Sequence, residues 1–317
     1  MKVVMINDCA YVGETLLKYF PADIEKQHIK RTRGLWNKTF GIAYKILRAK
    51  GDIYHVHYLL QDCYIASHLG KKPLVGHAHG SDLRETLRSR RWGGIVKSNL
   101  RSCNKILVAQ PTVLATAKEY NGSAEYFPIP FDPAFFYQKP LPQKRPEYHV
   151  FLASVHDFDV KGTDKLLRAV SLVQEKVKIK SFNAGKDIEK TKQLAKDLKL
   201  EIEFVSRVPH GAMNELFWES DLVLGSFATG REHLDTVAIE AMACGRPVVH
   251  SVPKKFFASC PLEELRDPPA TAEIISGLLS DQKARENRIN RQLDYVNGTH
   301  AAPILVEKLL KIYSTLS

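Results

Sequence analysis

Short apolar runs alternate with longer amphipathic stretches along this chain, and this alternation limits its fold more than any other feature. The runs read as buried strands, with amphipathic helices such as residues 164–176 between them. A stretch rich in proline and charge, residues 137–147, interrupts the pattern, which then starts again. Such alternation predicts an α/β protein with two parallel, doubly wound sheets. The predicted strands are 2–6, 52–58, 73–79 and 105–110 before this stretch, and 148–154, 177–185, 201–206, 221–226 and 246–251 after it.

The length of 317 residues also favours two domains over one small core. We expect Rossmann-like domains at residues 1–140 and 147–299, which face each other across a cleft. A closing helix at 300–317 is expected to pack back on the first domain. Ligands of such sheets bind beyond the C-terminal strand ends, beside helix N-termini. Polar residues at these ends are therefore the candidates for function.

The positive charge of the chain lies entirely in its first half. Residues 1–150 contain 23 Lys and Arg against 12 Asp and Glu (23 − 12 = +11), whereas residues 151–317 contain 23 of each. Residues 26–50 and 88–105 are basic and contain no acid. This surplus fits a solvated surface, and it also favours an anionic partner, either a membrane or nucleic acid. We expect a cytoplasmic protein, because the five cysteines are scattered and neither a signal peptide nor a long apolar run is evident. The basic surplus favours a peripheral position at the membrane.

Two polar groups follow predicted strands in the second half. His156 and Lys161 lie in a loop before a predicted helix, where cations suit a diphosphate. Glu232 lies in another loop and Glu240 on the helix that follows it, with Asp235 as the expected N-cap. Taken alone, Lys161 also fits a solvated loop lysine and Glu240 an ordinary surface residue of a helix.

The two glutamates belong to a longer pattern, E-x7-E followed by EAMACGRPVV. Together with VKGTDKLLRAV upstream, this segment resembles the donor-binding part of retaining glycosyltransferases of family four, which have the GT-B fold. HAHGSD in the first half and HAAPILVEKLLKIY at the end resemble further segments of that family. Three places depart from the family pattern: His156 stands in place of an arginine, Leu234-Asp235 in place of Phe-Gly, and the usual Asn-Gly before Asp132 is missing.

The resemblance implies a retaining, metal-independent glycosyltransferase that needs no cofactor beyond its nucleotide-diphosphate sugar donor. Glu232 would bind the donor sugar, Glu240 the ribose, and Lys161 with His156 the diphosphate. The catalytic group would comprise Glu232, His79 and Lys161, with His79 facing the transferred sugar. The acceptor would be a hydroxyl group of a glycan or of a lipid-linked, membrane-borne molecule. The remaining donor contacts implied are Gly13, Arg207, Val208, Thr236 and Val237.

Three other functions remain open at this point. Two H-x-H pairs, His55/His57 and His77/His79, could chelate a metal in a hydrolase, because alternate residues of a strand share a face. A sugar-nucleotide epimerase has the same two-domain fold. A non-enzymatic nucleic-acid binder fits the charge, although no recognised nucleic-acid motif is present.

Overall fold

The computed structural model describes residues 1–31, 40–143, 145–227 and 233–316 of the chain. It divides into two compact units, one formed by residues 1–130 and 300–317 and the other by residues 131–299. Each unit is an α/β structure around one parallel sheet, which confirms the predicted fold class. None of the helices in the described residues has the length and apolarity that a membrane span requires.

The first unit contains a parallel sheet of strand order β2-β1-β3-β4-β5-β6 in its described residues. Side chains of β1 alternate between two cores, because successive residues of a strand point to opposite faces. Val3 and Met5 pack beneath α1 and α13, whereas Val4 and Ile6 pack beneath α2 and α3. The strands are β1 (Lys2–Ile6), β2 (Glu25–Ile29), β3 (Ile53–His57), β4 (Leu74–Ala78), β5 (Lys105–Val108) and β6 (Glu125–Tyr126).

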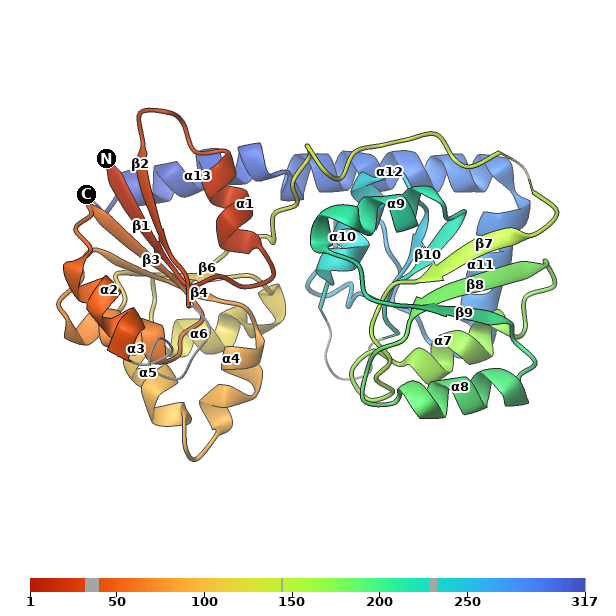
Figure 1. Ribbon diagram of the computed structural model, residues 1–317, viewed down its shortest axis with the longest axis horizontal. Helices are drawn as coiled ribbons and strands as arrows, with labels where there is room; N and C mark the ends of the chain where they lie inside the picture. The colour runs from red at the N-terminus through yellow and green to blue at the C-terminus, as the bar shows by residue number, and fades with distance from the viewer. Residues whose placement is uncertain (32–39, 144, 228–232, 317) are drawn as a thin grey trace. The chain divides into compact units, whose positions relative to one another are not determined.

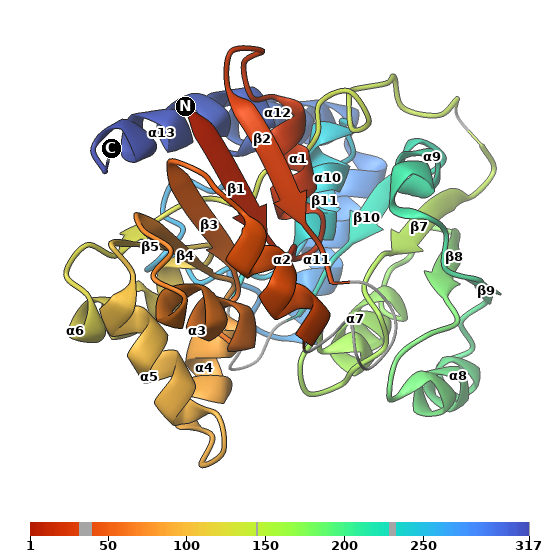
Figure 2. The ribbon, with the colours of Figure 1, turned by 60° about the vertical axis from the view of Figure 1, so that its left-hand side comes forward.

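Helices cover both faces of this sheet. Figure 2 shows α2, α3 and α5 next to one another on one face, while α1 and the closing helix α13 share the other. Leu305, Leu309 and Tyr313 of α13 are buried in the core of this unit. The helices are α1 (Val12–Lys18), α2 (Ile42–Arg48), α3 (Gln61–His68), α4 (Ser81–Arg84), α5 (Gly93–Ser102), α6 (Leu114–Tyr120) and α13 (Ala302–Ser314).

Helix α2 exposes much of its apolar surface. The apolar residues of the stretch 35–47 recur at helical spacing, which predicts an amphipathic helix. Its first part, up to residue 39, lies outside the described residues. Ile42 and Ile46 are buried against the sheet, whereas Phe40, Tyr44 and Leu47 are 66%, 63% and 54% exposed. The helix therefore has a second apolar face that its own unit does not cover.

The second unit has a parallel sheet of strand order β11-β10-β7-β8-β9. One face packs against α7 and α11, and on the other Phe151 contacts Phe217 of α9. The strands are β7 (Tyr148–Leu152), β8 (Val177–Phe182), β9 (Ile202–Val205), β10 (Leu222–Leu224) and β11 (Val248–Val249). The helices are α7 (Thr163–Val170), α8 (Ile188–Asp197), α9 (Met213–Trp218), α10 (Thr236–Ala243), α11 (Pro268–Ser280) and α12 (Gln282–His300).

Residues 131–140, which the sequence analysis assigned to the first domain, group with the second unit. A fully buried arginine explains this grouping. The guanidinium of Arg246 donates to the carbonyl oxygens of Lys139 and Pro140, the second at 2.9 Å. Asn214 Nδ2 donates to the carbonyl of Phe135 at 2.9 Å. These bonds satisfy polar groups that would otherwise be buried without a partner, so they fasten the segment to this unit.

Candidate functional site

Polar side chains gather at the C-terminal edge of the second sheet. Lys161 lies in the loop after β7, Ser226 follows β10, and His250 directly follows β11. Because all five strands are parallel, these ends meet at one edge. Helix α10 begins at the same edge and contributes Asp235 just before its first turn.

Lys161 and Asp235 form an ion pair in this cluster. The Lys161 Nζ atom lies 2.6 Å from Asp235 Oδ1, and the two side chains are only 17% and 9% exposed. Burial alone would raise the pKa of Asp235, but the charges of Lys161 and His233 hold it well below its usual value. The carboxylate is thus ionised and neutralises much of the lysine charge. Asp235 occupies the predicted N-cap position of α10, but its side chain accepts no hydrogen bond from the helix.

Ser226 and two histidines complete the surroundings of this pair. Ser226 Oγ donates to Asp235 Oδ2 at 2.5 Å, and its backbone N–H donates to His250 Nδ1 at 2.8 Å. His250 Nε2 lies 3.0 Å from the carbonyl oxygen of His233, so this nitrogen carries the proton. Burial lowers the pKa of His250 to about 4. His250 is therefore a neutral ring that fixes the loop before α10.

The glycine after Lys161 has a packing role. Gly162 has a φ of +60°, and a Cβ atom there would lie 2.2 Å from the carbonyl oxygen of Phe227. The carbonyl oxygen of Lys161 accepts from the backbone N–H of Phe227 at 2.7 Å. Only glycine fits both the positive φ and this contact, so the Lys-Gly pair joins the β7 loop to the β10 loop.

Glu240 lies on α10, as predicted, but it is not a surface residue. Its side chain is 2% exposed, and Oε1 accepts a hydrogen bond from His210 Nε2 at 2.6 Å. His210 follows β9 and also contacts the ring of Phe136, with centroids 5.2 Å apart. Burial raises the pKa of Glu240, and the bond from His210 opposes that shift. A buried carboxylate with one defined partner is a typical ligand-binding group.

The structure places the other predicted donor contacts in different surroundings. Arg207 is exposed and Val208 half-buried just beyond β9, while Thr236 and Val237 open α10 and are half-buried. His156 is fully buried, and its Nε2 donates to the carbonyl of Phe182 at 2.9 Å. Burial also lowers the pKa of His156, so its ring is neutral in the protein interior. This position gives His156 a packing role and does not favour one at a diphosphate.

Three predicted residues lie elsewhere. Glu232 is outside the described residues. Gly13 belongs to the first unit, where it lies in the first turn of α1 and not in the preceding loop. A Cβ atom at Gly13 would lie 2.9 Å from His57 Nε2, so glycine here makes room for that ring. His79 directly follows β4, and its Nε2 lies 3.0 Å from His57 Nδ1.

Sequence reasoning missed four polar members of this edge: His210, Ser226, His233 and His250. Ser226 and His250 stand at or near the end of a predicted strand, and His210 and His233 lie in loops that follow one, so their positions were a usable signal. The interaction partners could not be predicted from the sequence, because Lys161 and Asp235 are 74 residues apart and His210 and Glu240 are 30 residues apart.

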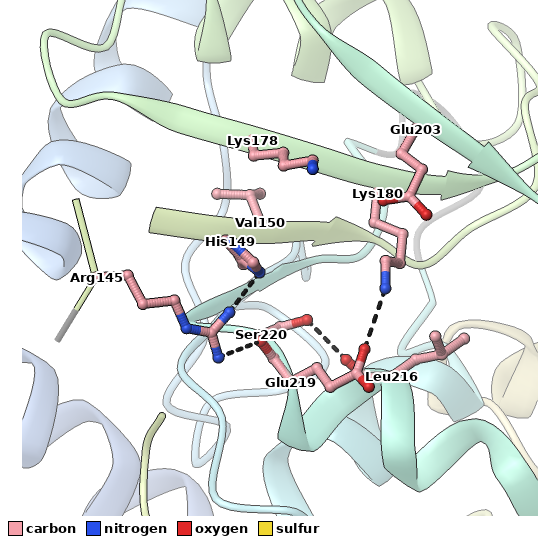
Figure 3. A pocket seen from close by; sticks show the side chains of 9 residues that line it. All are labelled: Arg145, His149, Val150, Lys178, Lys180, Glu203, Leu216, Glu219 and Ser220. Atoms are coloured by element: carbon pink, nitrogen blue, oxygen red, sulfur yellow. Dashed lines mark hydrogen bonds and ion pairs between the residues drawn. The ribbon is translucent and has the colours of Figure 1, made fainter. Parts of the chain in front are cut away.

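A hollow of about 310 Å³ in the second unit lies away from this edge. Figure 3 shows its lining, which includes His149 and Lys180. Its charges are largely paired with each other: Lys180 Nζ lies 3.1 Å from Glu219 Oε2, and Arg145 bonds to His149. Because His149 and Val150 stand near the start of β7, the hollow lies toward the opposite end of that strand and does not coincide with the candidate site.

Residues 146–281, most of the second unit, match the family model of glycosyl transferases group 1. This match confirms the resemblance of the second unit to group 1 glycosyltransferases. A comparison with curated protein sequences gives no match.

Solved structures show the same fold over the whole chain. The HepE protein of Anabaena in complex with UDP and glucose has 15% identity and a TM-score of 0.73, with 100% of both chains covered. A glycosyltransferase from Rickettsia africae has 13% identity and a TM-score of 0.69, covering 99% of this chain and 98% of that chain. The lipopolysaccharide outer core galactosyltransferase WaaB has 12% identity and a TM-score of 0.65, with 100% of both covered. The predicted GT-B fold is confirmed.

Proposed function

We propose that this protein is a retaining glycosyltransferase, which moves a sugar from a nucleotide-diphosphate donor to a hydroxyl acceptor. The observation that carries the proposal is the C-terminal edge of the second sheet. There, Lys161 and the buried Glu240 flank the start of α10 in a domain that matches group 1 glycosyltransferases. The complexes of HepE with UDP and with UDP-glucose support the donor class.

Glu240 is proposed to bind the ribose of the donor. A carboxylate accepts hydrogen bonds from two neighbouring hydroxyl groups, and His210 already fixes one of its oxygens at 2.6 Å. Burial of the carboxylate favours a defined partner over bulk water. Arg207 and Val208, which follow β9 as His210 does, are proposed to border the base.

Lys161 is proposed to pair with the diphosphate. Its partner Asp235 is ionised, so the donor phosphates must share or displace an existing ion pair. Thr236 and Val237 are the first residues of α10, and the side chain of Asp235 accepts no hydrogen bond from the backbone of this helix. This supports the predicted role of their backbone N–H groups as hydrogen-bond donors to an anion. The protein thus supplies cationic and dipolar groups for the leaving diphosphate, and we propose that transfer needs no divalent metal.

Glu232 and His79 keep their predicted roles at the donor sugar. We propose that Glu232 binds sugar hydroxyl groups and that His79 faces the transferred sugar. The half-buried position of His79 at the end of β4 supports this role. Gly13 is proposed to let the backbone approach the donor phosphate or the acceptor closely, because glycine has no side chain.

The acceptor is proposed to be membrane-borne, with the first unit docking on anionic lipid. Phe40, Tyr44 and Leu47 line an apolar hollow of about 640 Å³ with residues of α3, and we call these three residues the α2 patch. Lys45 and Arg48 of α2 are exposed beside it, and Arg88, Arg90 and Arg91 precede α5. Exposed aromatic and aliphatic side chains with basic residues on the same helix suit the interface of an anionic bilayer.

Product analysis without an acceptor tests the reaction class. Glycosyltransferases transfer sugar slowly to water, so we expect release of a nucleoside diphosphate and a free sugar. Proton NMR of the first product should show the anomer of the donor, also in excess EDTA. Inversion of the anomer would contradict retention. A nucleotide sugar with a changed sugar configuration would indicate an epimerase instead.

A further inference from the structure

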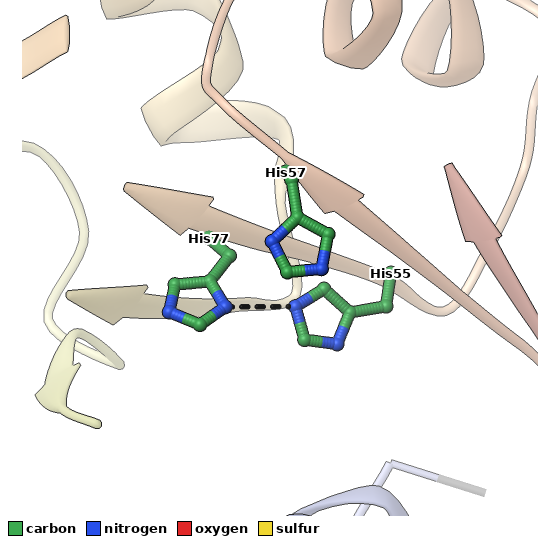
Figure 4. A group of neighbouring side chains, drawn as sticks. All are labelled: His55, His57 and His77. Carbon is green, nitrogen blue, oxygen red and sulfur yellow. Dashed lines mark hydrogen bonds between the residues drawn. The ribbon is translucent and has the colours of Figure 1, made fainter. Parts of the chain in front are cut away.

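Four histidines form a continuous stack in the first unit. His55 and His57 share one face of β3, and His77 lies opposite His57 in the parallel register with β4. The rings of His57 and His77 stack at 5.1 Å, and His79 continues the stack at 4.6 Å from His77. Figure 4 shows His55, His57 and His77 as close neighbours, with a hydrogen bond between His55 and His77. One ligand nitrogen from each of these three rings lies within 4.8 Å of the others.

The three converging rings are fully enclosed. His55, His57 and His77 have no exposed surface. Burial lowers the pKa of His55 to about 3 and those of His57 and His77 well below the usual value. The imidazoles are neutral, which is the form that binds metal ions.

Hydrogen bonds within the protein do not satisfy this cluster. Tyr313 OH lies 2.5 Å from His55 Nδ1, and His55 Nε2 lies 3.2 Å from His77 Nδ1. This chain ends at His77 Nε2, a buried nitrogen with no hydrogen-bond partner in the described structure. Burying such an atom without a partner destabilises the fold. A group of three buried histidines and a tyrosine with an unsatisfied nitrogen indicates a function other than packing.

A thioether adds a soft ligand to the cluster. Met5 Sδ lies 3.1 Å from His57 Nε2. The ligand set is therefore imidazole nitrogen and thioether sulfur, and among the described residues this group includes no carboxylate or thiolate. Mg²⁺ and Ca²⁺ require oxygen ligands. A divalent ion would also keep its full charge among neutral ligands in a dry interior, where the desolvation penalty is large.

We propose that His55, His57 and His77, with the thioether of Met5, form a closed binding site for Cu(I). A soft monovalent ion suits both ligand types, and its single charge is the least costly to bury. The site pins β3 to β4 and, through the His55–Tyr313 contact, to α13. It offers no exposed coordination position for water, which argues against the alternative of a metal-dependent hydrolase. The proposal is independent of the donor site in the second unit.

Anaerobic titration of the full chain with Cu(I), in competition with a colorimetric Cu(I) chelator, tests this site. We expect one equivalent of Cu(I) per chain and a rise in melting temperature. X-ray absorption at the copper edge should show nitrogen and sulfur neighbours. Zn²⁺ should compete at least a hundredfold less well. Absence of Cu(I) binding, or equal competition by Zn²⁺, would overturn the proposal.

Variants separate a built site from adventitious binding. His55→Phe/His77→Phe should lose the bound Cu(I). Met5→Leu conserves volume and should keep the fold while weakening Cu(I) binding about tenfold or more and removing the sulfur signal. His300→Gln is the matched control, because His300 is another buried histidine of this unit, bonded to the carbonyl of Ile129 outside the cluster. If the histidine variants fail to fold, Met5→Leu alone decides, and wild-type affinity in it would contradict the proposal.

Discussion

The ammonium group of Lys161 lies 2.6 Å from the carboxylate of Asp235, so the cation expected at a diphosphate is already paired within the protein. Ser226 holds the other oxygen of the same carboxylate. In the glycosyltransferase family that this segment resembles, glycine usually stands at the position of Asp235. At the proposed donor site, the diphosphate would therefore compete with Asp235 for Lys161.

Asp235→Asn should strengthen binding of a nucleoside diphosphate by about tenfold, or 1.4 kcal/mol. The change removes a negative charge next to the phosphate position and leaves Lys161 unpaired. Isothermal titration calorimetry with UDP measures it. Asp159→Asn is the control, since that carboxylate is exposed in the same loop. Weaker binding by Asp235→Asn would mean that Asp235 positions Lys161 for the donor instead of competing with it.

Glu240 and Glu232 should affect different steps. Glu240→Gln should weaken binding of free nucleotide about tenfold or more, because a charge-assisted hydrogen bond to the ribose is lost. Glu232→Ala should abolish transfer and leave nucleotide binding nearly unchanged. Calorimetry and turnover are measured for both, with the exposed Glu201→Gln as control. Equal losses of nucleotide affinity in the two variants would refute this division of roles.

Vesicle binding should depend on the α2 patch and on the basic residues before α5. Tyr44→Ser/Leu47→Ser and the charge reversal of Arg88, Arg90 and Arg91 should each reduce co-sedimentation with anionic vesicles, and high salt should do the same. Leu172→Ser, at a half-exposed leucine of the second unit, is the matched control. A wild-type chain that ignores anionic vesicles at low salt would favour a soluble acceptor, and preference for duplex DNA would favour nucleic acid.

Stability should fall as the pH drops below about 6.5. Burial lowers the pKa of His300 to about 4, so the folded chain keeps this ring neutral while the unfolded chain protonates it. Between pH 6.5 and pH 4 the unfolded state therefore binds more protons than the folded state. The contribution of His300 lowers the free energy of unfolding by about 1 kcal/mol for each pH unit of acidification in this range. His300→Gln should melt with a shallower pH dependence between pH 6.5 and 4.5. An unchanged slope would contradict the buried, neutral assignment.

The sequence pattern predicted the buried strands and missed the two edge strands of the first sheet, β2 and β6. Strand β2, Glu25–Ile29, is an edge strand in which only Ile29 is buried, so it has no apolar run to detect. Glu240 was placed correctly on its helix by local pattern. Its burial was not predictable, because it depends on the distant His210. The N-cap position of Asp235 was predicted correctly, but the partner of its side chain was not, because Lys161 lies 74 residues away.

A thermal-shift panel of UDP, GDP, ADP and dTDP sugars tests the central claim, that the edge of the second sheet binds a nucleotide-diphosphate sugar. The comparison chain is Lys161→Met/Asp235→Asn, which removes the ion pair as a whole and so leaves no buried charge unpaired. We predict that one class of donor raises the melting temperature of the wild type by mass action and that the double variant, folded without ligand, loses this response. A wild type that responds to no donor, or a double variant that responds as the wild type does, would contradict the account.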